Sequence, residues 1–170
     1  MSVRRAAVRF RGHVQPAEAF EHHLWRELRG RVTLRFRSAK VDPMPLVRID
    51  LARGKPSDYR RTVGAVVYEA MRSALNVPED DRFQIINEHP AENLIIDPGY
   101  LGITRTADCI LIQITLNDGR TVEQKKAFYK AVADGLQQRI KLRREDVFIS
   151  LVEVRKENWS FGNGEAQYAQ

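Results

Sequence analysis

The pair Met44-Pro45 holds the most reactive potential group in this chain of 170 residues. If translation starts at Met44 and that methionine is removed, the chain begins with proline. An amino-terminal proline is a secondary amine, a base and nucleophile that no internal residue can supply. As an internal residue, Pro45 has an amide nitrogen that cannot exchange a proton, and it would only open an edge strand. The functional interpretation therefore depends on which residue begins the working chain.

Four strands are predicted around this proline from alternating or continuous apolar residues. They span residues 46–51, 82–88, 109–116 and 147–154. The connector 89–108 contains the turn signal Asp97-Pro98-Gly99 and is expected to hold a short strand at 94–96. These strands predict the sheet that must position Pro45.

One helix is predicted between the two strands of each pair. Apolar residues at helical spacing mark the first, namely Val63, Val66, Val67, Ala70, Met71 and Leu75. A capping box from Thr121 to Gln124 opens the second helix. Its expected buried residues are Phe128, Ala131, Val132, Leu136 and Ile140. The order strand, helix, strand therefore occurs twice.

The two halves match at a constant offset of 65 residues. The matched pairs include Leu46 with Leu111, Gly54 with Gly119, Val67 with Val132, Asp81 with Asp146, and Glu88 with Glu153. One offset without gaps indicates an internal duplication, with repeats at about 45–88 and 109–154. We expect an α/β fold of tandem β-α-β repeats, a four-stranded mixed sheet with two helices on one face. Only the first repeat has the proline, because Ile110 takes its place in the second.

The positive charge is confined to the start of the chain. The net charge is +6, and the first 43 residues hold ten Lys and Arg but four Asp and Glu, which leaves eighteen of each in the remainder. A neutral remainder argues against nucleic-acid binding by the folded domain, because phosphate binding needs a clustered positive excess. We therefore divide the chain into a basic leader, residues 1–43, and a domain, residues 44–170, whose tail is 155–170.

The leader has three interpretations: a start codon assigned too early, a genuine disordered or regulatory arm, and a targeting segment. Its arginines suit an organelle transit peptide, but Glu18, Glu21 and Glu27 interrupt that pattern. We expect it to be extraneous or disordered. One cysteine and no long apolar segment fit a reducing compartment without a membrane span, so we expect a cytoplasmic protein.

Residues 44–168 resemble the tautomerase superfamily, whose hallmark is a catalytic amino-terminal proline. The likeness is to its two-repeat branch, which includes malonate semialdehyde decarboxylase. It rests on Pro45-Leu46, Gly54-Lys55, the segment Val77-Pro78-Glu79-Asp80-Asp81-Arg82-Phe83-Gln84, and the tail Asn158-Trp159-Ser160-Phe161-Gly162-Asn163-Gly164. The resemblance implies a trimer of two-repeat chains, which would also cover the bare face of the sheet.

The resemblance also implies roles for six residues. Pro45 would be the base or acid, Asp81 would assist it or orient water, and Arg120 would hold a substrate carboxylate. Asp118 stands where the decarboxylase has a second arginine, which favours tautomerisation over decarboxylation. Lys55 stands where related tautomerases have an arginine and would bind substrate through its charge alone. Trp159 and Phe161 would form the pocket wall.

Keto–enol interconversion needs a base that titrates near ambient pH. The unperturbed pKa of an α-amino group is about 8, and a neighbouring guanidinium lowers that pKa. A guanidinium also binds a carboxylate through two hydrogen bonds. We therefore expect a cofactor-independent tautomerase acting on a small 2-oxo or enol carboxylic acid. The alternatives are a decarboxylase or hydratase of a small acid such as malonate semialdehyde, and a binding module in which the leader blocks Pro45.

Each candidate also has a purely structural interpretation. Arg120 would be an exposed residue at a helix N-terminus, although the helix dipole disfavours a cation there. Asp81 would only end a helix–strand turn, as its counterpart Asp146 suggests. Trp159 and Phe161 would belong to the core or to an interface. The sequence contains neither a phosphate-binding loop nor a zinc-ligand spacing, so neither a cofactor nor a metal is expected.

Overall fold

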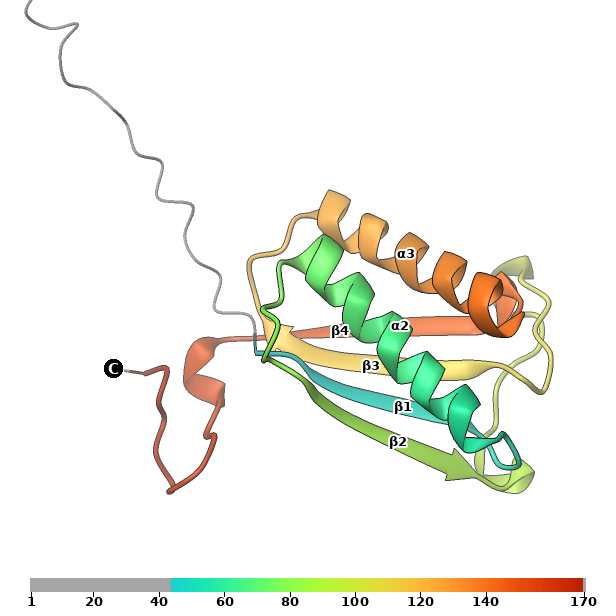
Figure 1. Ribbon diagram of the computed structural model, residues 1–170, viewed down its shortest axis with the longest axis horizontal. Coiled ribbons are helices and arrows are strands. Elements are labelled where there is room, and N and C mark those ends of the chain that lie inside the picture. Colours follow the sequence, from blue (N-terminus) through green and yellow to red (C-terminus); the bar gives the residue numbers. More distant parts are fainter. Residues whose placement is uncertain (1–43, 170) are drawn as a thin grey trace, which may run out of the picture. The chain divides into compact units, whose positions relative to one another are not determined.

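The computed structural model describes residues 44–169, which form a four-stranded sheet with two helices on one face (Figure 1). The predicted leader, residues 1–43, lies outside the described residues. The strands and helices in chain order are β1 (Leu46–Ala52), α2 (Ser57–Leu75), β2 (Phe83–His89), β3 (Ile110–Asn117), α3 (Val122–Ile140) and β4 (Val147–Val154). The predicted fold class is thereby confirmed.

The strand order places β1 inside the sheet. The order is β2-β1-β3-β4, in which β1 is parallel to β2, β3 is parallel to β4, and β1 is antiparallel to β3. The sheet is therefore mixed, as expected. Because β1 has a neighbour on both sides, Pro45 does not open an edge strand, and that interpretation is wrong.

The duplication is visible in the backbone. Helices α2 and α3 begin and end 65 residues apart, and both end on a left-handed residue, Asn76 with φ 57° and Lys141 with φ 58°. Gly54 and Gly119 share a positive φ, 105° and 108°, in the turns after β1 and β3. The turn needs glycine in both repeats because that φ is strained for other residues. The two repeats thus share the conformation of the turn before the helix and of the residue that ends the helix.

The core lies between the helices and one face of the sheet. Its buried side chains from the sheet include Val47, Ile49, Ile112, Ile114 and Leu116, and those from the helices include Val63, Val67, Met71, Phe128, Val132 and Leu136. The helices approach closely at Gly135, where a Cβ atom would lie 2.7 Å from Val66 Cγ1. The predicted capping box of α3 is present, with Thr121 and Gln124 bonded reciprocally.

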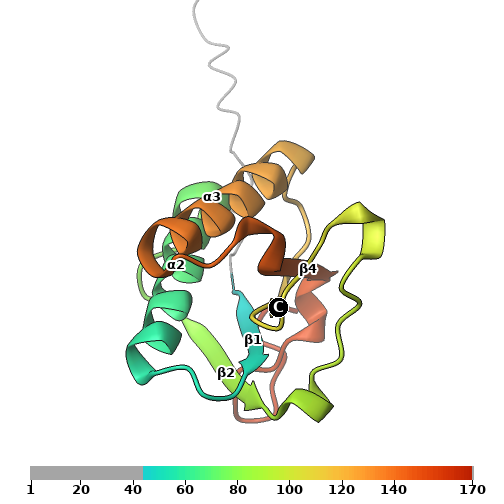
Figure 2. The same cartoon turned by 90° about the vertical axis from the view of Figure 1, so that its right-hand side faces the viewer.

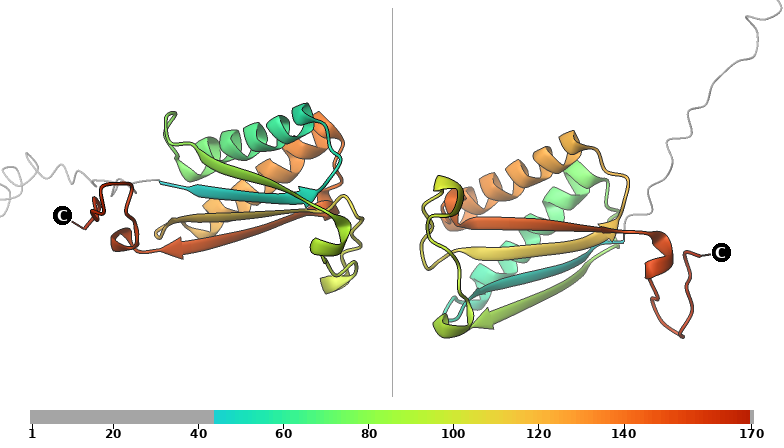
Figure 3. Two further views of the ribbon diagram at one scale, coloured as in Figure 1. Left: turned by 90° about the horizontal axis from the view of Figure 1, so that it is seen from below. Right: turned by 180° about the vertical axis from the view of Figure 1, so that it is seen from behind.

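The opposite face of the sheet is not covered by either helix (Figure 3). It exposes Phe83, Ile85, Phe148 and Val152, whose exposed fractions range from 36% to 51%. Near the ends of β1 and β2 the same face carries a polar cluster, in which Asp50 Oδ1 lies 2.7 Å from His89 Nε2 and 3.1 Å from Asn87 Nδ2. We call this whole surface the open face.

The connector between the repeats contains no regular strand. The expected strand at 94–96 is wrong: this stretch has no strand partner, and Ile95 is 89% exposed. Pro90 and Pro98 restrict the backbone on both sides, and short 3-10 turns at Ala91–Asn93 and Tyr100–Gly102 flank the stretch. Figure 2 shows the connector beside the end of the sheet at which β1 and β2 terminate.

Candidate active site

Three of the predicted residues converge at one end of the sheet. Pro45 immediately precedes β1, Asp81 precedes the parallel strand β2, and Arg120 follows the antiparallel strand β3. Because β1 lies between the other two strands, their corresponding ends are adjacent. Figures 1 and 3 show the start of β1, the end of β3 and the C-terminal tail at this end. Pro45 is itself buried.

Arg120 is buried, not exposed. Only 6% of its surface is accessible, and its guanidinium donates a hydrogen bond to the carbonyl of Asn117. Burial lowers the pKa of Arg120, and the carboxylates of Glu153, Asp81 and Asp118 oppose that shift. The interpretation of Arg120 as a surface residue is wrong. A buried guanidinium therefore lies at the same end of the sheet as Pro45, close enough to Asp81 for their charges to interact.

Asp81 and its repeat counterpart differ in their hydrogen bonding. Asp146 is buried and accepts bonds from the Thr106 amide at 2.6 Å and the Thr106 hydroxyl at 2.8 Å. Asp81 Oδ1 is equally shielded but has no hydrogen-bond partner among residues 44–169. Burial raises the pKa of Asp81, and the Arg120 charge partly opposes it. The fold satisfies one aspartate and leaves the other available.

The C-terminal tail adds an aromatic layer beside Arg120. The Trp159 and Phe161 rings stack with centroids 5.7 Å apart, and Tyr168 meets Phe161 edge-on at 4.9 Å. Trp159 Nε1 donates a 2.8 Å hydrogen bond to Asn117 Oδ1. Since Asn117 also bonds Arg120, the aromatic layer and the guanidinium share one anchor. Trp159 is half-buried and Phe161 is exposed, so neither is a core residue of this chain.

Lys55 lies at the other end of the sheet within the same chain. It follows β1, whereas Pro45 precedes that strand. Its Nζ lies 2.6 Å from Asp108 Oδ1 and 5.3 Å from the Tyr59 ring centre. These residues, with Asp146, help to line a hollow of about 470 Å³. Lys55 and Asp146 are the repeat counterparts of Arg120 and Asp81, so this hollow corresponds to the candidate site at the opposite end of the sheet. One chain alone therefore does not bring Lys55 to the candidate site.

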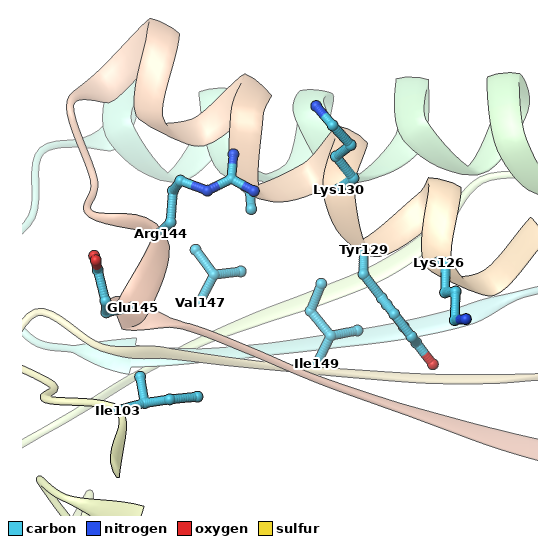
Figure 4. A pocket seen from close by; sticks show the side chains of 9 residues that line it. Ile103, Lys126, Tyr129, Lys130, Arg144, Glu145, Val147 and Ile149 are labelled. Carbon is cyan, nitrogen blue, oxygen red and sulfur yellow. The ribbon is translucent and has the colours of Figure 1, made fainter. Parts of the chain in front are cut away.

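A second hollow is unrelated to the candidate residues. A shallow groove of about 650 Å³ lies between α3 and β4, and Figure 4 shows Val147 and Ile149 on its floor with Lys126 and Lys130 above. In the first repeat, the corresponding space is occupied by Gln84, whose amide donates to the Gly64 carbonyl at 2.9 Å. The groove contains neither Pro45, Asp81 nor Arg120, so it is not the candidate site.

Comparison with known proteins identifies the family. Two family models, both described as tautomerase enzyme, match residues 45–103 and 81–162. The probable tautomerase YusQ of Bacillus subtilis (strain 168) is 41% identical over 124 residues, which cover 73% of this chain and 98% of that protein. The chain belongs to the tautomerase family. The probable tautomerase YrdN of the same organism is 35% identical to this chain over 125 residues, which cover 74% of this chain and 96% of YrdN.

Solved structures place this tautomerase in the two-repeat branch. The FG41 malonate semialdehyde decarboxylase, inhibited by 3-bromopropiolate, superimposes with a TM-score of 0.67 at 35% identity, covering 73% of this chain and 94% of that one. A fused 4-OT, described as a symmetric trimer, shares the fold with a TM-score of 0.60 at 23% identity and coverages of 73% and 98%. The predicted family and branch are confirmed.

The sequence interpretation of this tautomerase missed Asn117. No motif marked it; the only signal was that Ala52 occupies its position in the first repeat. Tyr168 was also missed, since the tail has no periodicity.

Among the described residues there is no group of three His, Cys, Asp or Glu that could hold a metal ion. Within the same residues, no helix is both long and apolar enough to span a membrane.

Proposed function

We propose that this protein is a cofactor-independent tautomerase that uses the secondary amine of Pro45, exposed as the amino terminus, on a small 2-oxo or enol carboxylic acid. The observation that carries this proposal is the convergence of Pro45, Asp81 and Arg120 at one end of the sheet, where Arg120 is only 6% exposed. The tautomerase family model begins its match at Pro45, which supports the same starting residue.

In the proposed reaction, the neutral amine of Pro45 removes the proton from the enol hydroxyl of the substrate. The electron pair of that O–H bond forms the carbonyl, and the enol double bond takes up a proton at its terminal carbon from the resulting ammonium. The amine is regenerated, so the reaction is a balanced isomerisation that needs no second reactant. Proline supplies this base because the unperturbed pKa of an α-amine is about 8.

Arg120 would bind the substrate carboxylate through two guanidinium N–H groups and stabilise negative charge on the enolate. Asp81 would accept a hydrogen bond from the Pro45 ammonium or from the substrate hydroxyl through Oδ1, which has no partner within residues 44–169. Trp159 and Phe161 would exclude water from one side of the substrate. Lys55 could contribute only from a neighbouring subunit, which makes the expected trimer part of the proposal.

A decarboxylase or hydratase acting on malonate semialdehyde is the second candidate. It is favoured by the 35% identity to the FG41 enzyme and by the family resemblance, which implies that Asp81 stands at the decarboxylase's aspartate position. Asp118 in place of a second arginine argues against it. A third candidate is a binding module in which residues 1–43 remain attached and keep the Pro45 nitrogen an amide.

Steady-state kinetics on a chain that begins at Pro45 separate these candidates. We expect rapid ketonisation of phenylenolpyruvate and at most slow decarboxylation of malonate semialdehyde. Pro45→Ala exchanges the ring-held secondary amine for a freely rotating primary amine and should reduce kcat for ketonisation about 100-fold, because a misplaced catalytic group can cost about that much. The matched control is Pro56→Ala, at the start of α2 and away from the site. Unchanged kcat in Pro45→Ala would exclude a requirement for the secondary amine. Unchanged kcat in a chain that retains Met44, in which the Pro45 nitrogen is an amide, would exclude the amine mechanism.

A further inference from the structure

We infer that Asn117 is a positioning residue whose side chain fixes the Trp159 indole beside the Arg120 guanidinium, so that substrate binding depends on it. Asn117 is the last residue of β3 and is 1% exposed. It lies between two groups of the candidate site, bonded to Arg120 through its carbonyl and to Trp159 through its side chain. This inference rests on the proposed function for its kinetic consequence only.

The repeat symmetry shows that the fold itself does not require this asparagine. The counterpart of Asn117 is Ala52, the last residue of β1, and the two strands end at matched positions of the repeats. Burying an amide is unfavourable unless it is hydrogen-bonded, whereas alanine has no such penalty. An asparagine at the end beside Pro45, with alanine at the other end, therefore points to a local role.

The geometry specifies that role. The 2.8 Å bond from Trp159 Nε1 to Asn117 Oδ1 sets the plane of the indole, which in turn stacks on Phe161 with an interplanar angle of 20°. Within the tail, the Phe161 amide donates to Gln167 Oε1 at 3.0 Å and Tyr168 meets the Phe161 ring edge-on, whereas the indole nitrogen bonds Asn117 of β3. Without the bond, the indole would lose its fixed orientation. The aromatic wall would then no longer exclude water from the guanidinium.

Tryptophan fluorescence tests this positioning without any assay of activity. The chain has two tryptophans, so the full chain carrying Trp25→Phe reports on Trp159 alone. Asn117→Ala should shift the emission to longer wavelength and raise the acrylamide quenching constant about twofold or more. Asn117→Asp keeps an acceptor oxygen and should restore the parent emission. Thr106→Val, which removes the hydroxyl bond to Asp146 at the other end of the sheet, is the matched control and should leave the emission unchanged.

The kinetic readout uses a chain that begins at Pro45. Asn117→Ala should raise KM for phenylenolpyruvate about tenfold and change kcat less than threefold, with an unaltered pH profile, because substrate binding is impaired and the amine is not. Trp159→Phe alone breaks the same bond while it keeps Asn117, so it should raise KM similarly and provides the test if Asn117→Ala folds poorly. Adding Asn117→Ala to Trp159→Phe should have no further effect.

Three results would overturn the inference: parent-like emission in Asn117→Ala, an equal shift in Asn117→Asp, or a further loss in the Trp159→Phe background. If the parent chain ketonises no enol acid, the proposed function fails, and the fluorescence comparison still decides whether Asn117 positions Trp159.

Discussion

Arg120 and Lys55 occupy the same position in the two repeats, 65 residues apart, but lie at opposite ends of the sheet in opposite surroundings. Arg120 is 6% exposed and close enough to Asp81 to influence its pKa. Lys55 is neutralised by Asp108 on the connector, at 2.6 Å. The same position of the repeat is therefore a buried arginine in one half and a lysine in a surface ion pair in the other.

Replacing Arg120 should impair carboxylate binding. Arg120→Lys keeps the charge but loses the bidentate fork, and Arg120→Met also removes the charge. We expect kcat/KM for phenylenolpyruvate to fall about 10-fold in the first and about 100-fold or more in the second, since hydrogen bonds between charged groups contribute about 1.5–3 kcal/mol each. Steady-state kinetics measure this. Equal activity of Arg120→Met and the parent would exclude a role for the guanidinium.

Asp81→Asn should stabilise the protein while reducing activity. Burial raises the pKa of the folded Asp81 carboxyl above its unfolded value, so the folded state holds this proton to higher pH. Its contribution to stability is thus present at low pH and is lost as pH rises through the raised pKa. Urea unfolding should show that the advantage of Asp81→Asn is smallest below the ordinary aspartate pKa and grows above it. An advantage that does not change with pH would contradict this.

Lys55 should act across a subunit interface. Chains beginning at Pro45 and carrying either Pro45→Ala or Lys55→Met should each be weakly active alone. Unfolded together and refolded as mixed trimers, they should regain activity in about one quarter of the sites, because each site would combine two subunits. The control is a mixture of the two variant trimers that have not been unfolded, in which no activity should be regained. Full activity of Lys55→Met alone would remove Lys55 from the mechanism.

The open face should form the contact between subunits. It exposes Phe83, Ile85, Phe148 and Val152, whereas an isolated subunit would leave this surface in water. We expect the protein to sediment as a trimer and Ile85→Glu to dissociate it. Val122→Glu, which also adds a charge at an exposed apolar residue but on α3, should remain trimeric. Sedimentation of the parent as a monomer would refute the prediction.

The sequence was sufficient for the fold because the repeats are regular. The alternation around Val47 and Ile49, the helical spacing around Val67 and the capping box at Thr121 each act locally, and the structure agrees with all three. The strand expected at 94–96 failed because strand formation needs a partner as well as apolar residues. Local pattern cannot reveal such a partner.

The site was predictable only in part. Which residues belong together depended on topology: Arg120 meets Asp81 because β3 runs antiparallel to β1, and Lys55 is excluded from that end of its own chain for the same reason. Asn117 was not predictable, because its importance comes from two hydrogen bonds to residues 3 and 42 positions away. No spacing in the sequence encodes that combination.

The central claim is that Pro45 begins the working protein. The most direct measurement is the intact mass of the protein purified from cells that express it from its own gene. We predict the mass of a chain from Pro45 to Gln170, well below the 19.6 kDa of the full chain. A mass that includes residues 1–44 would contradict the claim, because the Pro45 nitrogen would then be an amide with no proton to exchange.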